Sequence, residues 1–116
     1  MKHNIIKDKT ISFAVEIVKF CQILMQSKEF VIADQLKRSG TSIGAQIWEA
    51  EHAQSNADFI HKLSIAQKEA NETIYWLEIL QRINDKNIPK ISSLKFWVEE
   101  ILRILTSIIK SCKAKR

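Results

Sequence analysis

The chain has 116 residues, and only two of them are glycine and one is proline. A hydrophobic fraction of 46% with 27% charged residues excludes a disordered protein and is compatible with one globular domain. Because glycine and proline supply most tight turns, their scarcity argues against hairpin-rich folds and predicts long helices with short connections. The formal net charge is +5. All of this excess lies in residues 88–116, since residues 1–87 carry equal numbers of basic and acidic side chains.

The chain contains no pattern that indicates export or a membrane. Its first residues, MKHNIIKDKT, lack the apolar run of a secretory signal peptide, and no uncharged apolar stretch reaches about 18 residues. We therefore expect a cytoplasmic protein with no membrane partner. Cys21 and Cys112 fall on apolar helix faces, so we expect reduced thiols rather than catalytic thiolates, which need an electropositive and partly exposed setting.

Four segments have apolar residues at helical spacing, and they predict helices at about 10–27, 30–53, 56–84 and 92–112. Thr10 is the predicted N-cap of the first helix, and Ser55 or Asn56 that of the third. Pro89 interrupts the pattern, so the fourth helix is expected to begin at Ser92 or Ser93. Short connections force neighbouring helices to run antiparallel, which predicts a single all-α domain, residues 1–116, with an up-down-up-down four-helix bundle.

The apolar positions also predict association between copies. In the second helix the core residues alternate at spacings of four and three, which is the pattern of a left-handed bundle: Leu36, Gly40, Ile43, Ile47 and Ala50. The first helix is apolar around most of its circumference, and the third carries a second apolar stripe. Such helices need covering on more than one side, so a homo-oligomer is expected.

Both glycines fall inside the second helix, where each costs about 1 kcal/mol relative to alanine. Gly40 and Gly44 share one face, which indicates close approach of another backbone, with Ala66 and Ala70 of the third helix as the expected partners. A phosphate-binding loop is rejected, because such a loop follows a strand and ends in Gly-Lys-Ser/Thr. We therefore predict a helix-packing or oligomer interface formed by five residues: Gly40, Ile43, Gly44, Ile47 and Trp48.

Catalytic and metal sites have weak support. Glu49 with His52 and Asp58 with His61 show the Glu-x-x-His offset of di-iron bundles, but they lie at the end of the bundle rather than in its middle. Glu69 and Glu72 are explained by ion pairs with Lys37 or Arg38 on the second helix. We expect no catalytic residue, no metal and no cofactor.

The basic end of the chain is the remaining candidate site. It comprises Arg103, Lys110, Lys113, Lys115 and Arg116. One interpretation is a solvated face whose cations complement the C-terminal dipole of the helix. The other is sequence-independent contact with the phosphates of RNA or DNA, strengthened when several copies present their charges together.

Two blocks of sequence resemble the bacterial four-helix-bundle family named for 23S rRNA intervening sequences. The first runs from Lys37 through Ser39-Gly40-Thr41-Ser42-Ile43-Gly44 to Ala50, and the second from Ala57 to Leu77. Residues 13–18 are similar to the family's opening helix, whereas Gln46 and Trp48 depart from its usual pattern. The resemblance implies a cytosolic homopentamer without assigned catalytic activity. It also implies kinship with the accessory variability determinant of diversity-generating retroelements, which associates with nucleic acid and a reverse transcriptase.

Three functions follow as hypotheses. The first is a non-enzymatic, basic oligomer that binds RNA or DNA non-specifically, as an accessory to a ribonucleoprotein or a reverse transcriptase. The second is a protein-interaction scaffold without affinity for nucleic acid. The third, and most remote, is a metal-dependent enzyme.

Overall fold

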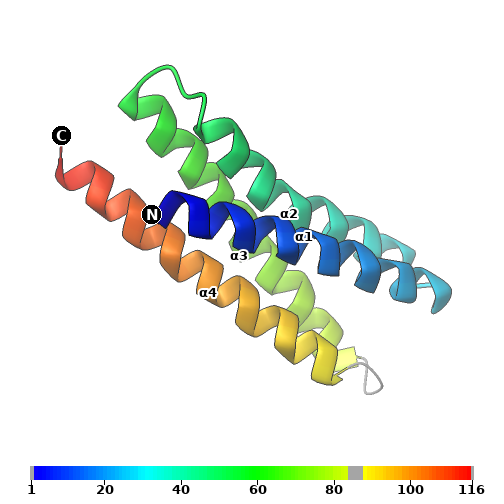
Figure 1. Cartoon of the computed structure of the whole chain (residues 1–116). Helices are drawn as coiled ribbons and strands as arrows, with labels where there is room; N and C mark the ends of the chain where they lie inside the picture. The colour runs from blue at the N-terminus through cyan, green and yellow to red at the C-terminus, as the bar shows by residue number, and fades with distance from the viewer. Residues whose placement is uncertain (1, 84–87, 116) are drawn as a thin grey trace.

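The computed structural model describes the backbone of residues 2–83 and 88–115 and the side chains of residues 5–83 and 89–115. It contains four helices, α1 (Lys2–Gln26), α2 (Phe30–Ala50), α3 (Asn56–Ile83) and α4 (Ile88–Ala114), and the described part has no strand. The molecule is elongated, with extents of 47 × 20 × 20 Å, and the helices lie along its length (Figure 1). The fold is all-α, as the sequence predicts.

The helices form a closed circuit in which α1 packs on α2, α2 on α3, α3 on α4 and α4 on α1. A polar pair spans each of the four interfaces. Lys7 of α1 pairs with Glu51 just after α2 at 2.9 Å, and Thr73 of α3 donates to Ser39 of α2 at 2.9 Å. Gln67 of α3 donates to Thr106 of α4 at 2.9 Å, and Lys9 of α1 pairs with Glu100 of α4 at 3.1 Å.

The predicted core positions are buried. All five residues of the four-three pattern in α2 are inside, and so are Leu63, Ala66, Ala70, Thr73, Leu77 and Leu80 in α3. The core positions of α3 begin at Ile60, which is buried, whereas the neighbouring Phe59 is only partly buried. In α4 the buried positions include Leu94, Val98, Ile101, Leu105 and Ile108.

Two predicted helix starts are wrong. The first helix begins at Lys2 rather than at Thr10, which lies buried in mid-helix with its hydroxyl 2.9 Å from the carbonyl oxygen of Ile6. The early start follows from Ile6, which is buried in the core and anchors the additional turns. The fourth helix begins at Ile88 rather than at Ser92 or Ser93. Pro89 lies in its first turn, where the missing N–H would have no helical partner and proline is tolerated.

The remaining helix ends are close to prediction. Ser55 caps α3, because its Oγ accepts a hydrogen bond from the Asp58 N–H at 3.0 Å, and the Asp58 carboxylate accepts one from the Gln54 N–H at 3.1 Å. The α2 helix ends at Ala50, before the predicted residue 53, and α4 extends past residue 112 to Ala114. Residue 84, the predicted end of α3, lies outside the described residues.

The glycines of α2 contact α1, not the alanines of α3. A Cβ at Gly40 would lie 3.0 Å from Cγ2 of Ile17, and one at Gly44 would lie 3.2 Å from the Thr10 hydroxyl. The expected partners Ala66 and Ala70 are buried in the core but are not among the atoms nearest to these positions. The two glycines therefore set how closely α1 approaches α2.

Arg38 of α2 joins two carboxylates of α3. Its guanidinium lies 3.3 Å from Glu69 and also pairs with Glu72, as expected from the sequence. The indole N–H of Trp76 donates to Glu72 at 3.1 Å. The Trp76 hydrogen bond and then the Arg38 hydrogen bond lower the pKa of Glu72 below its usual 4.5. This cluster is a structural link between α2 and α3.

A substitution at Gly40 tests the close approach of α1 and α2. Alanine gains about 1 kcal/mol of helix propensity, but its methyl group meets Ile17, a fully buried β-branched side chain with little freedom to move. We expect Gly40→Ala to lower the free energy of unfolding by about 1–2 kcal/mol in denaturant titrations, since overpacking outweighs propensity. The loss should vanish in an Ile17→Ala background, and an equal loss in both backgrounds would contradict this explanation.

The Arg38 cluster predicts acid sensitivity. Because the folded-state pKa of Glu72 is lowered, its contribution to stability is present at neutral pH and is lost as the pH falls from about 4.5 through the lowered pKa. Trp76→Phe removes the N–H donor and keeps a ring, so it should raise the pKa of Glu72 in a carboxyl-carbon NMR titration. Tyr75→Phe is the matched control. An unchanged pKa in Trp76→Phe would refute the assigned cause.

Candidate functional site

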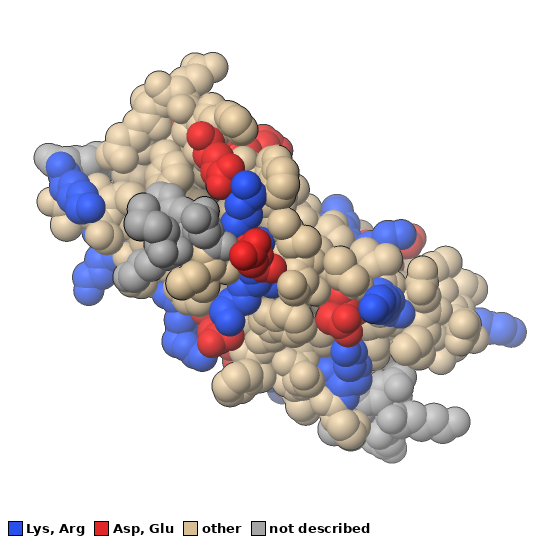
Figure 2. Space-filling model, viewed as in Figure 1, with Lys and Arg blue, Asp and Glu red and all other residues tan. Residues whose placement is uncertain are grey.

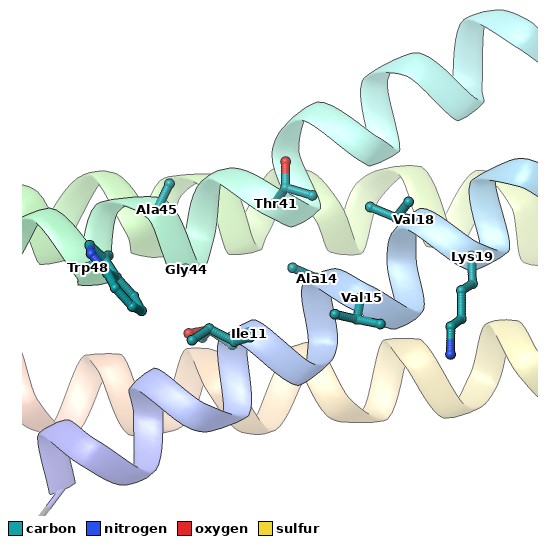
Figure 3. A pocket seen from close by; sticks show the side chains of 10 residues that line it. Ile11, Ala14, Val15, Val18, Lys19, Thr41, Gly44, Ala45 and Trp48 are labelled. Carbon is teal, nitrogen blue, oxygen red and sulfur yellow. The ribbon is translucent and has the colours of Figure 1, made fainter.

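An apolar groove of about 530 Å³ lies between α1 and α2. Small residues form its floor, namely Ala14 and Gly44, because the glycine keeps the two helices close, and the exposed Ala45 lies at its rim. Larger apolar side chains form its walls, and Trp48 closes one end while Lys19 lies at the other (Figure 3). A narrow floor of small residues with apolar walls suits an inserted helix better than a polar ligand.

Trp48 is half exposed and is held in place by a cation. The Lys7 ammonium group lies 4.1 Å from the centre of the indole ring and also pairs with Glu51. A cation over an indole face is attracted by the negative face of the ring. The end wall of the groove is therefore fixed by a charged contact rather than by core packing.

The five residues predicted as one packing face separate into two groups. Gly40, Ile43 and Ile47 are buried within the subunit, so they pack the four helices together. Gly44 and Trp48 reach the groove and remain available to a partner. The sequence pattern does not separate the two groups, because their positions are interleaved along the same helix.

The apolar surface surplus expected for α1 is present. Four of its large apolar side chains are between 42% and 47% exposed: Ile11, Val15, Ile23 and Met25. Ile11 and Val15 line the α1–α2 groove. Part of the surplus is thus gathered into one concave surface, whereas Ile23 and Met25 do not line it.

Three of the predicted basic residues, Arg103, Lys110 and Lys113, lie on the outer side of α4, and Lys115 directly follows its end. Arg103, Lys110, Lys113 and Lys115 are exposed, and Arg116 lies outside the described residues. None of these four cations forms an ion pair with a described residue. Lys and Arg side chains lie along the edge of the molecule that α4 forms toward the C-terminus (Figure 2). Residues 101–116 contain no Asp or Glu, so within this segment nothing neutralises them.

Cations elsewhere are mostly paired. Among the described basic side chains before Arg103, eight form ion pairs with carboxylates: Lys7, Lys9, Lys19, Arg38, Lys62, Arg82, Lys90 and Lys95. The exceptions in that part are Lys28, Lys37 and Lys68. Pairing thus ceases where the acidic residues of α4 end at Glu100, and the free positive charge collects at the C-terminal half of α4.

A second groove, of about 570 Å³, lies between α1 and α4 and was not predicted from the sequence. Its lining mixes apolar, hydroxyl and charged groups: Ile5, Asp8, Lys9, Ser12, Ser93, Phe96, Trp97 and Glu100. Phe96 is 67% exposed, and Trp97 is fixed by an edge-on contact with Phe13, with ring centres 5.5 Å apart. The only sequence signal for this groove is an aromatic residue at an outward position of α4.

The described residues show neither a metal-binding cluster nor an activated Cys21 thiol. No cluster there of three or more His, Cys, Asp or Glu side chains could hold a metal ion, and His52 and His61 are both exposed. Burial raises the pKa of the Cys21 thiol to about 11, which is unfavourable for a nucleophile. Cys21 and Cys112 are both free thiols. Within the same residues, no helix combines the length and apolarity needed to cross a bilayer.

Comparison with known proteins agrees with the sequence resemblance. No curated protein gives a significant match. A crystal structure from Bacteroides thetaiotaomicron VPI-5482, of a protein with unknown function from the S23 ribosomal protein family, is 54% identical. The match covers 95% of this chain and 99% of that one, with a TM-score of 0.91. The model of the family described as 23S rRNA-intervening sequence protein matches residues 2–107. The chain therefore belongs to the 23S rRNA-intervening sequence protein family.

Proposed function

We propose that this protein is a non-enzymatic homo-oligomer that binds RNA or DNA without sequence specificity, as an accessory to a ribonucleoprotein or a reverse transcriptase. The C-terminal half of α4 is the proposed phosphate-contacting surface. A ring of copies would place several such surfaces on one particle, and a particle with that charge attracts polyanions.

The observation that carries this proposal is the separation of paired and unpaired cations. Arg103, Lys110, Lys113 and Lys115 are exposed and lack ion-pair partners among the described residues, whereas most earlier cations are paired. If these cations served only to complement the C-terminal dipole of α4, basic residues would be needed only in its last turn. Arg103 lies about three turns before the end of α4, where the dipole gives no reason for an unpaired charge.

The proposal includes an antiparallel bundle that assembles with copies of itself. Two observations support the antiparallel arrangement. Lys7, early in α1, pairs with Glu51 just after the end of α2. Along α4 the partners run backwards through α1, since Lys90 pairs with Glu16 and Glu100 pairs with Lys9. The apolar α1–α2 groove supports assembly, since a groove of this character on a single subunit exposes surface that a partner helix would cover. The number five rests on the family resemblance.

The second candidate function is a protein-interaction scaffold without affinity for nucleic acid. The α1–α2 groove favours it, because a foreign amphipathic helix could occupy the same floor of small residues. The two candidate functions differ in whether the cations of α4 bind nucleic acid, and this binding can be measured.

Neutralising the unpaired cations tests nucleic-acid binding. We expect the variant with Arg103, Lys110, Lys113, Lys115 and Arg116 all changed to Gln to bind a mixed RNA or DNA duplex more weakly at low salt. In a fluorescence-anisotropy titration, the slope of log affinity against log salt should fall by about 1 for each phosphate that the variant no longer binds. The control changes Lys28, Lys37 and Lys68 to Gln, which removes three unpaired cations from other surfaces, and it is compared with the variant that changes only Lys110, Lys113 and Lys115 to Gln. Equal losses of affinity in both variants, or no binding by the wild type at low salt, would refute the proposal.

A charge placed in the α1–α2 groove tests assembly. Val15→Glu puts a carboxylate on the groove wall, where a covering helix would have to desolvate it. We expect multi-angle light scattering to show an oligomer for the wild type and mainly monomer for the variant. Val31→Glu, at a position 73% exposed and outside the groove, should leave the oligomer intact. A wild-type monomer, or an unchanged oligomer in Val15→Glu, would contradict this assignment of the interface.

A further inference from the structure

The groove between α1 and α4 differs in chemistry from the one between α1 and α2. It carries an exposed aromatic ring, a second aromatic as a fixed wall, two serine hydroxyls and charges of both signs. A helix that inserts into a groove requires a continuous apolar floor, which this groove lacks. A flat, polar-edged aromatic ligand is the better match for such a lining.

We propose that this groove receives a base of a single-stranded nucleic acid, with Phe96 as the stacking platform. This inference rests on the proposed function and specifies the form of nucleic acid that α4 binds. Phe96 offers most of its surface to solvent, and bases stack on exposed aromatic side chains irrespective of sequence. A duplex hides its bases and cannot use such a platform, so the groove would favour single strands.

The position of Phe96 relative to the free cations supports this ligand. Arg103 and Lys110 follow Phe96 at intervals of seven residues, so the three lie on one stripe of α4, separated by about 10.5 Å per interval. Ile5 lines both the groove and an adjoining cavity of about 310 Å³ that Arg103 also lines, which makes the surface continuous between the ring and the cation. A strand with one base on Phe96 would therefore direct its backbone phosphates along the unpaired charges.

The acidic residues of the groove restrict which bases fit. The Glu100 carboxylate is neutralised by Lys9 at 3.1 Å. Asp8 is exposed, lines the groove and forms no ion pair with a described residue. It would repel a phosphate, but it can accept a hydrogen bond from the exocyclic amine of cytosine. Thymine presents a carbonyl oxygen at the same place, so the groove would prefer cytosine to thymine.

The same surface could instead contact a second copy of the chain. Its mixture of charges makes that assignment weaker than for the α1–α2 groove, which is lined almost entirely by apolar groups. The two grooves are therefore assigned to different ligands, the first to a helix of another copy and the second to a nucleobase.

Affinities of the full-length protein for three probes test this inference. The probes are oligo(dC), oligo(dT) and a mixed duplex of the same length, all measured by fluorescence anisotropy at low salt. The wild type should bind oligo(dC) about five-fold more tightly than oligo(dT), the value expected for one hydrogen bond. Asp8→Asn should abolish that preference.

Phe96→Ala should weaken binding of both single strands about ten-fold, as expected for loss of one stacked base, and leave duplex binding unchanged. Phe96→Trp should restore single-strand binding. Tyr75→Ala is the matched control, because it removes a ring that is 58% exposed on α3.

The outcomes separate the inference from the proposed function. If Phe96→Ala leaves single-strand affinity unchanged while neutralising the cations of α4 abolishes it, the base site is wrong and the phosphate surface stands. If the wild type binds none of the probes, both are wrong. If Phe96→Ala changes the oligomeric state in light scattering, the groove is a contact between copies, and the base site is again wrong.

Discussion

The close contact between α1 and α2 determines most of what the molecule presents to its surroundings. Gly40 allows Ile17 to approach the backbone of α2, and Gly44 allows the same for Thr10. Each glycine costs helix propensity, yet the approach buries Ile17 completely and leaves a shallow, apolar floor between the two helices. A Cβ at either position would meet an α1 side chain at 3.0 or 3.2 Å, so a larger residue would push α1 away from α2. The same two residues thus serve the core of the subunit and shape the surface proposed for assembly.

Paired and unpaired cations lie mostly in different parts of the chain. Arg38, Glu69 and Glu72 form a closed network across α2 and α3, and Lys90 with Glu16 and Lys95 with Glu78 link α4 to its neighbours. Exposed pairs of this kind contribute little to stability, but they neutralise most of the positive side chains on this part of the surface. Residues 101–116 contain no Asp or Glu, and the four described cations there form no ion pair with a described residue. A protein that used its charge only for solubility would not need this separation.

The helical fold was predictable because each segment repeats its apolar residues through many turns. All five positions of the four-three pattern in α2 are buried, and the scarcity of glycine and proline predicted long helices. The wrong starts had a physical cause in each case. Thr10 is a good cap in isolation, but the buried Ile6 stabilises an earlier start. Pro89 ends a helix when it lies inside one, yet it is accommodated in the first turn of α4.

The site was less predictable than the fold. Its cations were identified from composition, since charge is a property of the sequence, and the Arg38 ion pairs were expected from the facing helices. The glycine contacts were assigned to the wrong helix, because small residues on α3 are equally suitable by sequence and only the packing of Ile17 decides between them. The α1–α4 groove was missed because it depends on residues from two distant segments, and a single exposed Phe96 carries no periodic signal.

Lysine footprinting tests most directly whether the C-terminal half of α4 is the surface that binds nucleic acid. The full-length protein, with and without single-stranded nucleic acid at low salt, is acetylated briefly, and modification at each lysine is quantified by mass spectrometry. We expect bound nucleic acid to protect Lys110, Lys113 and Lys115, while the equally unpaired Lys28, Lys37 and Lys68 remain reactive. Protection of the second set, or uniform reactivity in the presence of saturating nucleic acid, would contradict α4 as the binding surface.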